Sequence, residues 1–103
     1  MKQVVTASLE VLALGTGSTS MSRFVCEAVK AVRDKGLKYR ITPMGTAIEA
    51  SSVDAVFEAA KAAHEAVIST GAMRVVTHLT IDDRRDRPGT MDEKVRSVES
   101  KLR

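Results

Sequence analysis

Two glutamates stand in strand-like segments where a side chain facing a core would be apolar. Glu49 lies in the segment RITPMGTAIEA, residues 40–50, among small and apolar neighbours, and Glu10 interrupts the apolar run of residues 4–14. A partly buried carboxylate requires a cation or hydrogen-bond donors. Either Arg40 supplies the cation from within the protein, or a bound organic cation or a hydrogen-bonding heterocycle balances the carboxylates.

Hydroxyl groups and one imidazole accompany these carboxylates. The loop GTGSTS, residues 15–20, precedes a predicted helix whose first amide groups attract anions. It lacks the lysine of a phosphate loop and the third glycine of a dinucleotide-binding loop. We therefore expect it to close over a small ligand, with Ser18 or Ser20 as a hydroxyl donor or helix cap. The predicted ligand-binding residues are Ser8, Glu10, Ser18, Ser20, Thr42, Thr46, Glu49 and His78.

The sequence contains few residues that could bind a metal or carry out catalysis. His64 and His78 lie on different predicted elements and Cys26 is the single cysteine, so we expect no metal site and no cofactor. Neither histidine has a serine or cysteine partner with the local pattern of a nucleophile. Glu10 and Glu49 could form an acid–base pair, but no motif with catalytic spacing supports one, so we expect no enzyme.

Charge and composition indicate one domain, residues 1–103, in the cytoplasm. The net charge of +3 is spread over alternating basic and acidic residues, and the stretch DDRRDR at 82–87 is neutral, which argues against a nucleic-acid partner. No run approaches the ~18 apolar residues of a membrane span. Thr6, Ser8 and Glu10 interrupt the segment where an export signal would be continuous. A lone cysteine excludes an internal disulfide and suits a reducing compartment.

Alternation and helical spacing predict the elements that position these residues. Apolar residues alternate with polar ones from Val5 to Val11, as in a half-buried strand. The predicted order is a strand at 5–11, a helix from Met21 to Gly36, strands at 38–42 and 46–50 around Pro43 and Gly45, a helix from a capping box at 51–54 to Gly71, a strand at 73–81, and a short helix opened by a capping box at 90–93.

This order is typical of the α+β class and of a ferredoxin-like βαββαβ sandwich with an extra C-terminal helix. Two helices would cover one face of the sheet, with the first and third strands as parallel neighbours at its centre and the second and fourth strands at its edges. The other face would stay open. An open face and an unmatched apolar stripe on the terminal helix predict a homo-oligomer. That stripe is Met91, Val95, Val98 and Leu102.

Two segments of the chain have a distinctive sequence: YRITPMGTAIEA at residues 39–50, followed by a helix with His64 and Glu65, and MRVVTHLTIDDRRD at residues 73–86. Together they resemble the small thiamine-binding protein family. The resemblance implies a ferredoxin-like fold, assembly as dimers or tetramers, and binding of thiamine or its hydroxymethylpyrimidine part without known catalysis.

The resemblance also implies roles for individual residues. Thr46 and Glu49 belong to the family motif, and Ser18 or Ser20 corresponds to a loop serine before the first helix. The chain departs from the family pattern where GTGSTS replaces a proline-containing turn and where Ala50 replaces a glycine.

Thiamine joins an aminopyrimidine to a permanently positive thiazolium. A carboxylate such as Glu49 or Glu10 would stabilise the cation, and hydroxyl groups would bond the pyrimidine edge. We therefore expect a cytosolic, non-catalytic binder of thiamine or a related hydroxymethylpyrimidine, acting as a carrier, buffer or sensor. The alternative is an oligomeric structural or regulatory module without a small-molecule ligand, in which Glu49 pairs with Arg40.

Overall fold

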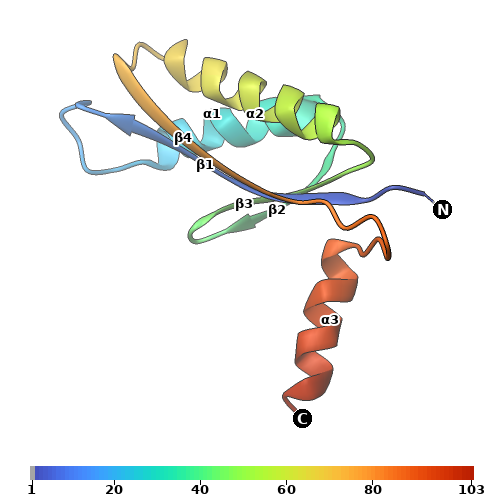
Figure 1. Cartoon of the computed structure of the whole chain (residues 1–103). Helices are drawn as coiled ribbons and strands as arrows, with labels where there is room; N and C mark the ends of the chain where they lie inside the picture. Colours follow the sequence, from blue (N-terminus) through green and yellow to red (C-terminus); the bar gives the residue numbers. More distant parts are fainter. Residues whose placement is uncertain (1) are drawn as a thin grey trace.

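The computed structural model of the chain describes residues 2–103 as a four-stranded sheet, with two helices on one face and a third helix that projects from the opposite side (Figure 1). The elements are β1 (Val5–Leu14), α1 (Ser22–Asp34), β2 (Lys38–Thr42), β3 (Gly45–Ala50), α2 (Val53–Ile68), β4 (Arg74–Asp82) and α3 (Met91–Lys101). The predicted ferredoxin-like βαββαβ order and the extra C-terminal helix are confirmed.

The sheet order is β2-β3-β1-β4, and every neighbouring pair is antiparallel. The predicted central and edge strands are therefore confirmed, but the predicted parallel pairing of β1 with β3 is wrong. Each strand–helix–strand unit does join parallel strands, β1 to β2 and β3 to β4. A strand of the other unit lies between the two members of each pair, so no parallel strands are neighbours.

The core lies between the sheet and the two covering helices and is built from aliphatic and alanine side chains. Ile48 on β3 and Val5 on β1 point into it from the sheet, and Val32 on α1 and Val56 on α2 meet them from above, all four with no exposed surface. Small side chains such as Ala63, also fully buried, let the helices approach closely.

Helix caps explain where α2 and α3 begin. The Ser52 hydroxyl accepts a hydrogen bond from the Ala55 N–H at 3.1 Å, so Ser52 caps α2. The capping box predicted from Ser51 is wrong because the cap lies one residue later and the third helical residue is then an alanine. The predicted capping box of Thr90 with Glu93 at the start of α3 is confirmed.

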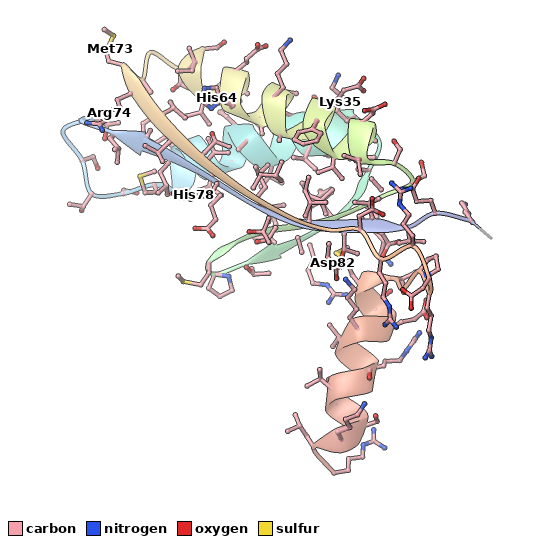
Figure 2. The ribbon with its side chains drawn as sticks, in the orientation of Figure 1. Lys35, His64, Met73, Arg74, His78 and Asp82 are labelled. Atoms are coloured by element: carbon pink, nitrogen blue, oxygen red, sulfur yellow. The ribbon has the colours of Figure 1, made fainter. Side chains whose placement is uncertain are left out.

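The first turn of α3 is fixed to the sheet by polar contacts. Asp92 receives hydrogen bonds from Lys38 at 2.8 Å and Arg40 at 2.5 Å, both on β2. Lys94 donates to the Thr6 hydroxyl at 2.6 Å and pairs with Asp82 at the end of β4. Figure 2 labels Asp82 beside this first turn. The helix beyond it extends away from the sheet (Figure 1).

The pKa shifts of Asp92 and Lys38 predict that acid weakens the contact between α3 and the sheet. The hydrogen bond from Lys38 is the main cause that lowers the pKa of Asp92, and the same bond raises the pKa of Lys38. A carboxyl whose folded-state pKa is lowered stabilises the fold above its unfolded pKa, near 4, and this contribution is lost as the pH falls through the folded value. We expect Asp92→Asn to lower the melting temperature at pH 7, and the difference from wild type to shrink below pH ~4. Thermal unfolding between pH 7 and pH 3 measures this, with Asp34→Asn at the end of α1 as the control.

Candidate functional site

A cavity of about 420 Å³ lies where the β2–β3 hairpin, β1 and the start of α1 meet. We refer to it as the hairpin cavity. The Thr42 hydroxyl shapes the turn beneath it, because it donates to the Gly45 carbonyl at 2.8 Å and accepts from the Gly45 N–H at 3.1 Å. The walls are mostly apolar. The lining residues are Leu9, Glu10, Val11, Leu12, Met21, Val25, Ala28, Thr42, Pro43, Met44, Gly45 and Thr46.

Thr46 brings a hydroxyl into this apolar cavity. It pairs with Leu9 across β1 and β3, so it lies on the helix-covered face, and the residue is 6% exposed. No buried side-chain oxygen or nitrogen of residues 2–103 lacks a hydrogen-bond partner, so the Thr46 hydroxyl, which bonds no protein group in that range, keeps some access to solvent. A nearly buried hydroxyl without a protein partner is well placed to bond a polar group of a ligand.

Glu10 brings a carboxylate to the same cavity. It belongs to β1, is half-buried, and pairs with His78 across β4. Gly45 makes room for it, since a Cβ atom at position 45 would lie 3.0 Å from Glu10 Cγ and 3.1 Å from the Leu9 carbonyl oxygen. In the described part of the chain Glu10 has no ion-pair partner. Its charge is therefore available to a cationic ligand.

Glu49 lies elsewhere. Its Oε1 atom accepts a hydrogen bond from the Met91 N–H at 2.8 Å, at the positive N-terminus of α3. It pairs with Lys38 across β2 and lines a different cavity of about 390 Å³. Arg40, the predicted alternative partner of Glu49, forms its ion pair with Asp92 instead. The structure therefore places Glu49 at the α3 junction and does not bring it to Thr46.

The two glutamates are also well separated from each other. Glu49 pairs with Thr6 on β1, whereas Glu10 lies four residues further along that strand. Four residues of a strand span about 13 Å, so the two carboxylates do not repel each other at close range and do not form an acid–base pair.

Of the other predicted ligand residues, Thr42 lines the hairpin cavity, and Ser8, Ser18, Ser20 and His78 do not. Ser8 lines a second cavity of about 390 Å³ on the open face, below the start of α3. His78 is exposed on the same face, opposite Glu10. Figure 2 labels it on β4, with His64 in the helix layer above.

Ser18 and Ser20 lie in the exposed loop before α1. The Ser18 hydroxyl accepts from the Ser20 N–H at 3.1 Å, which stabilises the loop. Neither serine caps the helix, because the N-cap residue is Met21 and it makes no side-chain cap bond. The expectation of a serine cap is therefore wrong, and Met21, not a serine, reaches the cavity wall.

The apolar wall of the cavity was missed by reasoning from polar residues. Met21, Val25 and Leu9 belong to this wall, and Val25 remains 36% exposed although its helical spacing fits a buried stripe. Phe24 and Ala28 beside it are buried, so Val25 lies at the border of the covered face of α1. Apolar residues beside a glycine-rich loop were the available signal.

Residues 2–103 offer neither a metal-binding cluster nor a membrane-spanning helix. No three His, Cys, Asp or Glu side chains come together there in a way that could hold a metal ion. No helix in that range combines the length and apolar character needed to cross a bilayer.

Comparisons with known proteins agree on one family. A family model described as thiamine-binding protein matches residues 7–99. A UPF0045 protein of Methanothermobacter thermautotrophicus is 48% identical over 99 residues, covering 96% of this chain and 100% of the relative. The solved structure of hypothetical protein MJ1052 from Methanocaldococcus jannaschii matches with a TM-score of 0.84 at 33% identity, covering 96% of this chain and 98% of the other. A Thermotoga maritima protein, TM0486, provisionally assigned to thiamine biosynthesis or salvage, matches with a TM-score of 0.75 at 25% identity, covering 97% and 99%.

Proposed function

Because the chain belongs to the thiamine-binding protein family, we propose that it binds thiamine or a related hydroxymethylpyrimidine compound in the cytosol, without catalysis, as a carrier, buffer or sensor. The observation that carries this proposal is the hairpin cavity, which combines an apolar wall with the Thr46 hydroxyl and with a Glu10 carboxylate that has no ion-pair partner among residues 2–103. Self-association as a dimer or tetramer is part of the proposal.

The cavity suits such a ligand in size and chemistry. Its volume of about 420 Å³ falls in the range of small-molecule sites, which are mostly apolar with a few polar groups that fix orientation. The aliphatic and methionine side chains would pack on the pyrimidine ring, and Thr46 would bond its polar edge. Glu10 would stabilise either the aminopyrimidine donors or the positive thiazolium.

The remaining predicted ligand residues have different proposed roles. Thr42 holds the turn and borders the ligand. Ser8 and His78, on the open face near Glu10, would contact parts of a ligand that extend beyond the hairpin. Ser18 and Ser20 would reach a ligand through a change in the loop at residues 15–20.

We propose that the protein is not a catalyst because of the surroundings of its two histidines, His64 and His78. His64 is held by Thr77 at 2.6 Å between α2 and β4, away from the cavity. His78 is exposed, and the hydrogen bonds of residues 2–103 do not link it to a nucleophile. Binding alone therefore accounts for the groups that line the cavity.

A second candidate function is a structural or regulatory module without a small-molecule ligand. It is favoured by one observation, the apolar stripe of α3, on which Val98 is 60% and Leu102 is 79% exposed. Such a module would need the stripe for assembly and would leave the hairpin cavity without a ligand.

Isothermal titration with thiamine, thiamine phosphates and hydroxymethylpyrimidine tests the proposal. We expect saturable heat with at least one of them. We expect Thr46→Val to weaken binding roughly 2- to 10-fold, since a neutral hydrogen bond contributes about 0.5–1.5 kcal/mol. Thr80→Val, on the exposed open face, is the matched control and should bind as wild type does. If none of the compounds gives heat or a thermal shift, the second candidate function, a structural or regulatory module without a ligand, explains the protein better.

A further inference from the structure

Another cavity, of about 200 Å³, lies at the end of the sheet where β1 ends and β4 begins. We refer to it as the loop-end cavity. Its walls come from Gly15 and Thr16 before α1, Arg23 and Phe24 on α1, and residues 70–73 after α2. It shares no lining residue with the hairpin cavity. Its volume is below the ~300 Å³ at which sites for drug-sized ligands begin, so it suits a small chemical group.

Arg23 is the charged residue in the wall of this cavity. Its guanidinium carbon lies 4.6 Å from the centroid of the Phe24 ring. Phe24 is 3% exposed, so a buried ring supports the guanidinium at the cavity. Among residues 2–103, Arg23 has no ion-pair partner. Its N–H groups are therefore available to an anion.

The surroundings of the loop-end cavity carry positive charge. The two loops beside it, GTGSTSM at 15–21 and STGAM at 69–73, contain no acidic residue. Arg74 follows the second loop, pairs with Leu14 across β1, and has no ion-pair partner in the described part of the chain. Figure 2 labels Met73 and Arg74 at this end of β4. A positive potential at this end of the sheet attracts anions.

The C-terminus of α2 also borders the cavity, and free carbonyl groups there would repel an anion. Two of these carbonyl groups already accept hydrogen bonds. The Thr70 hydroxyl donates to the Val67 carbonyl at 2.7 Å, and the Gly71 N–H donates to the Ile68 carbonyl at 3.0 Å. The negative end of this helix is therefore partly neutralised.

The backbone of the loop before α1 can supply further donors. None of the hydrogen bonds in the loops of residues 2–103 uses the N–H groups of Gly15 and Thr16. A Cβ atom at position 15 would meet no other atom within 4 Å, so the space beside this backbone is open. Backbone N–H groups of such loops bind phosphate oxygens. The loop lacks the lysine of a phosphate loop, and Arg23 provides a cation in its place.

We propose that the loop-end cavity binds a phosphate group. Arg23 would donate two N–H groups to it in the bidentate geometry that guanidinium and phosphate share, and Gly15 and Thr16 would donate from the backbone. Two sources have this chemistry: inorganic phosphate, and the phosphate of a small molecule such as thiamine monophosphate. The site is built from its own residues and does not depend on the hairpin cavity.

Titration with inorganic phosphate, in a buffer that contains no other phosphate, tests the site. Two-dimensional NMR of the backbone amides follows the titration and locates the bound anion. We expect saturable chemical-shift changes at Gly15, Thr16 and Gly71. Added sodium chloride should weaken the binding, because salt screens the attraction between the anion and an exposed arginine.

Substitutions of Arg23 test its role. Arg23→Gln should weaken phosphate binding roughly 10-fold or more, as expected when a charged hydrogen bond is lost. Arg23→Lys keeps the charge without the bidentate geometry and should recover part of the affinity. Arg33→Gln is the matched control, because it removes the same charge from the last turn of α1, where Arg33 pairs with Asp34, and it should bind as wild type does. Circular dichroism should show that all three variants are folded.

Thiamine monophosphate distinguishes the two sources of phosphate. If its phosphate occupies the loop-end cavity, Arg23→Gln will weaken the binding of thiamine monophosphate and leave that of thiamine unchanged. If inorganic phosphate is the ligand, Arg23→Gln will weaken the binding of phosphate alone. Both results support the site.

Three results would overturn the phosphate site: no saturable shift with either phosphate compound, shifts confined to other parts of the chain, or an Arg23→Gln variant that binds both compounds as wild type does. A protein that binds inorganic phosphate here and does not bind thiamine would overturn the proposed function alone.

Discussion

Replacing Glu10 with glutamine is expected to weaken thiamine binding by about 10- to 150-fold, because losing a charged hydrogen bond costs about 1.5–3 kcal/mol. Glu10 lines the hairpin cavity and has no ion-pair partner in the described residues, so its charge is free for a cation. The amide keeps the size of the side chain and fits the space beside Gly45. The fold should therefore be preserved.

The ligand series sharpens this prediction. Thiamine carries a permanent positive charge, whereas hydroxymethylpyrimidine is neutral near pH 7. If the Glu10 carboxylate stabilises the thiazolium, Glu10→Gln should lose much more affinity for thiamine than for the pyrimidine alone. Equal losses for both ligands would mean that Glu10 bonds the pyrimidine edge. Isothermal titration of both compounds against wild type and variant measures the difference.

Glu49→Gln is the matched control, since it removes the same charge from a neighbouring strand. Glu49 already accepts a hydrogen bond from the Met91 N–H, so we expect this variant to loosen α3 and to keep the affinity for thiamine. The resemblance to the family instead implies that Glu49 belongs to the binding motif. If Glu49 is the ligand carboxylate, Glu49→Gln will weaken thiamine binding and Glu10→Gln will leave it unchanged.

Thr46 and Glu49 were predicted to belong to one binding site, but the structure places them at two different sites. The alternation of side chains along β3 explains this difference. Thr46 and Glu49 are three residues apart, and a strand places such residues on opposite faces. The RITPMGTAIEA segment therefore serves two surfaces, the hairpin cavity through Thr46 and the α3 junction through Glu49. This parity can be read from the sequence, but the partners across the strands cannot.

Local patterns predicted the elements well because their causes are local. The alternation from Val5 to Val11 continues to Leu14 in β1, and the Thr90–Glu93 capping box opens α3 as expected. Register and direction depend on distant residues. Asp92 is held by Lys38 and Arg40, more than fifty positions away, and nothing in the sequence around residue 92 indicates that contact.

The same distinction applies to the cavity. Its hydroxyl and carboxylate were among the predicted ligand residues, but the sequence could not show that Thr46 and Glu10 line one cavity while Glu49 lines another. That grouping follows from the pairing of β1 with β3 and from the absence of a side chain at Gly45.

Stability should respond most strongly at Ile48, two residues from Thr46 on the same face of β3. Its side chain is fully buried between Ala7 and Tyr39 in the sheet, so Ile48→Ala leaves a cavity that the core cannot readily fill. Such substitutions cost about 2–5 kcal/mol. For a domain of this size we expect the melting temperature to fall by roughly 8 °C or more.

Ile41→Ala provides the control for this substitution. Ile41 lies on the same covered face but on the edge strand β2, where it is 65% exposed, so its loss should lower the melting temperature far less. Similar losses at the two positions would contradict a core centred on β3.

Saturating thiamine should raise the melting temperature of both variants, because a ligand that binds the native state stabilises it by mass action. If thiamine does not raise the melting temperature of Ile48→Ala but raises that of Ile41→Ala, the core beneath β3 also supports the position of Thr46 in the hairpin cavity.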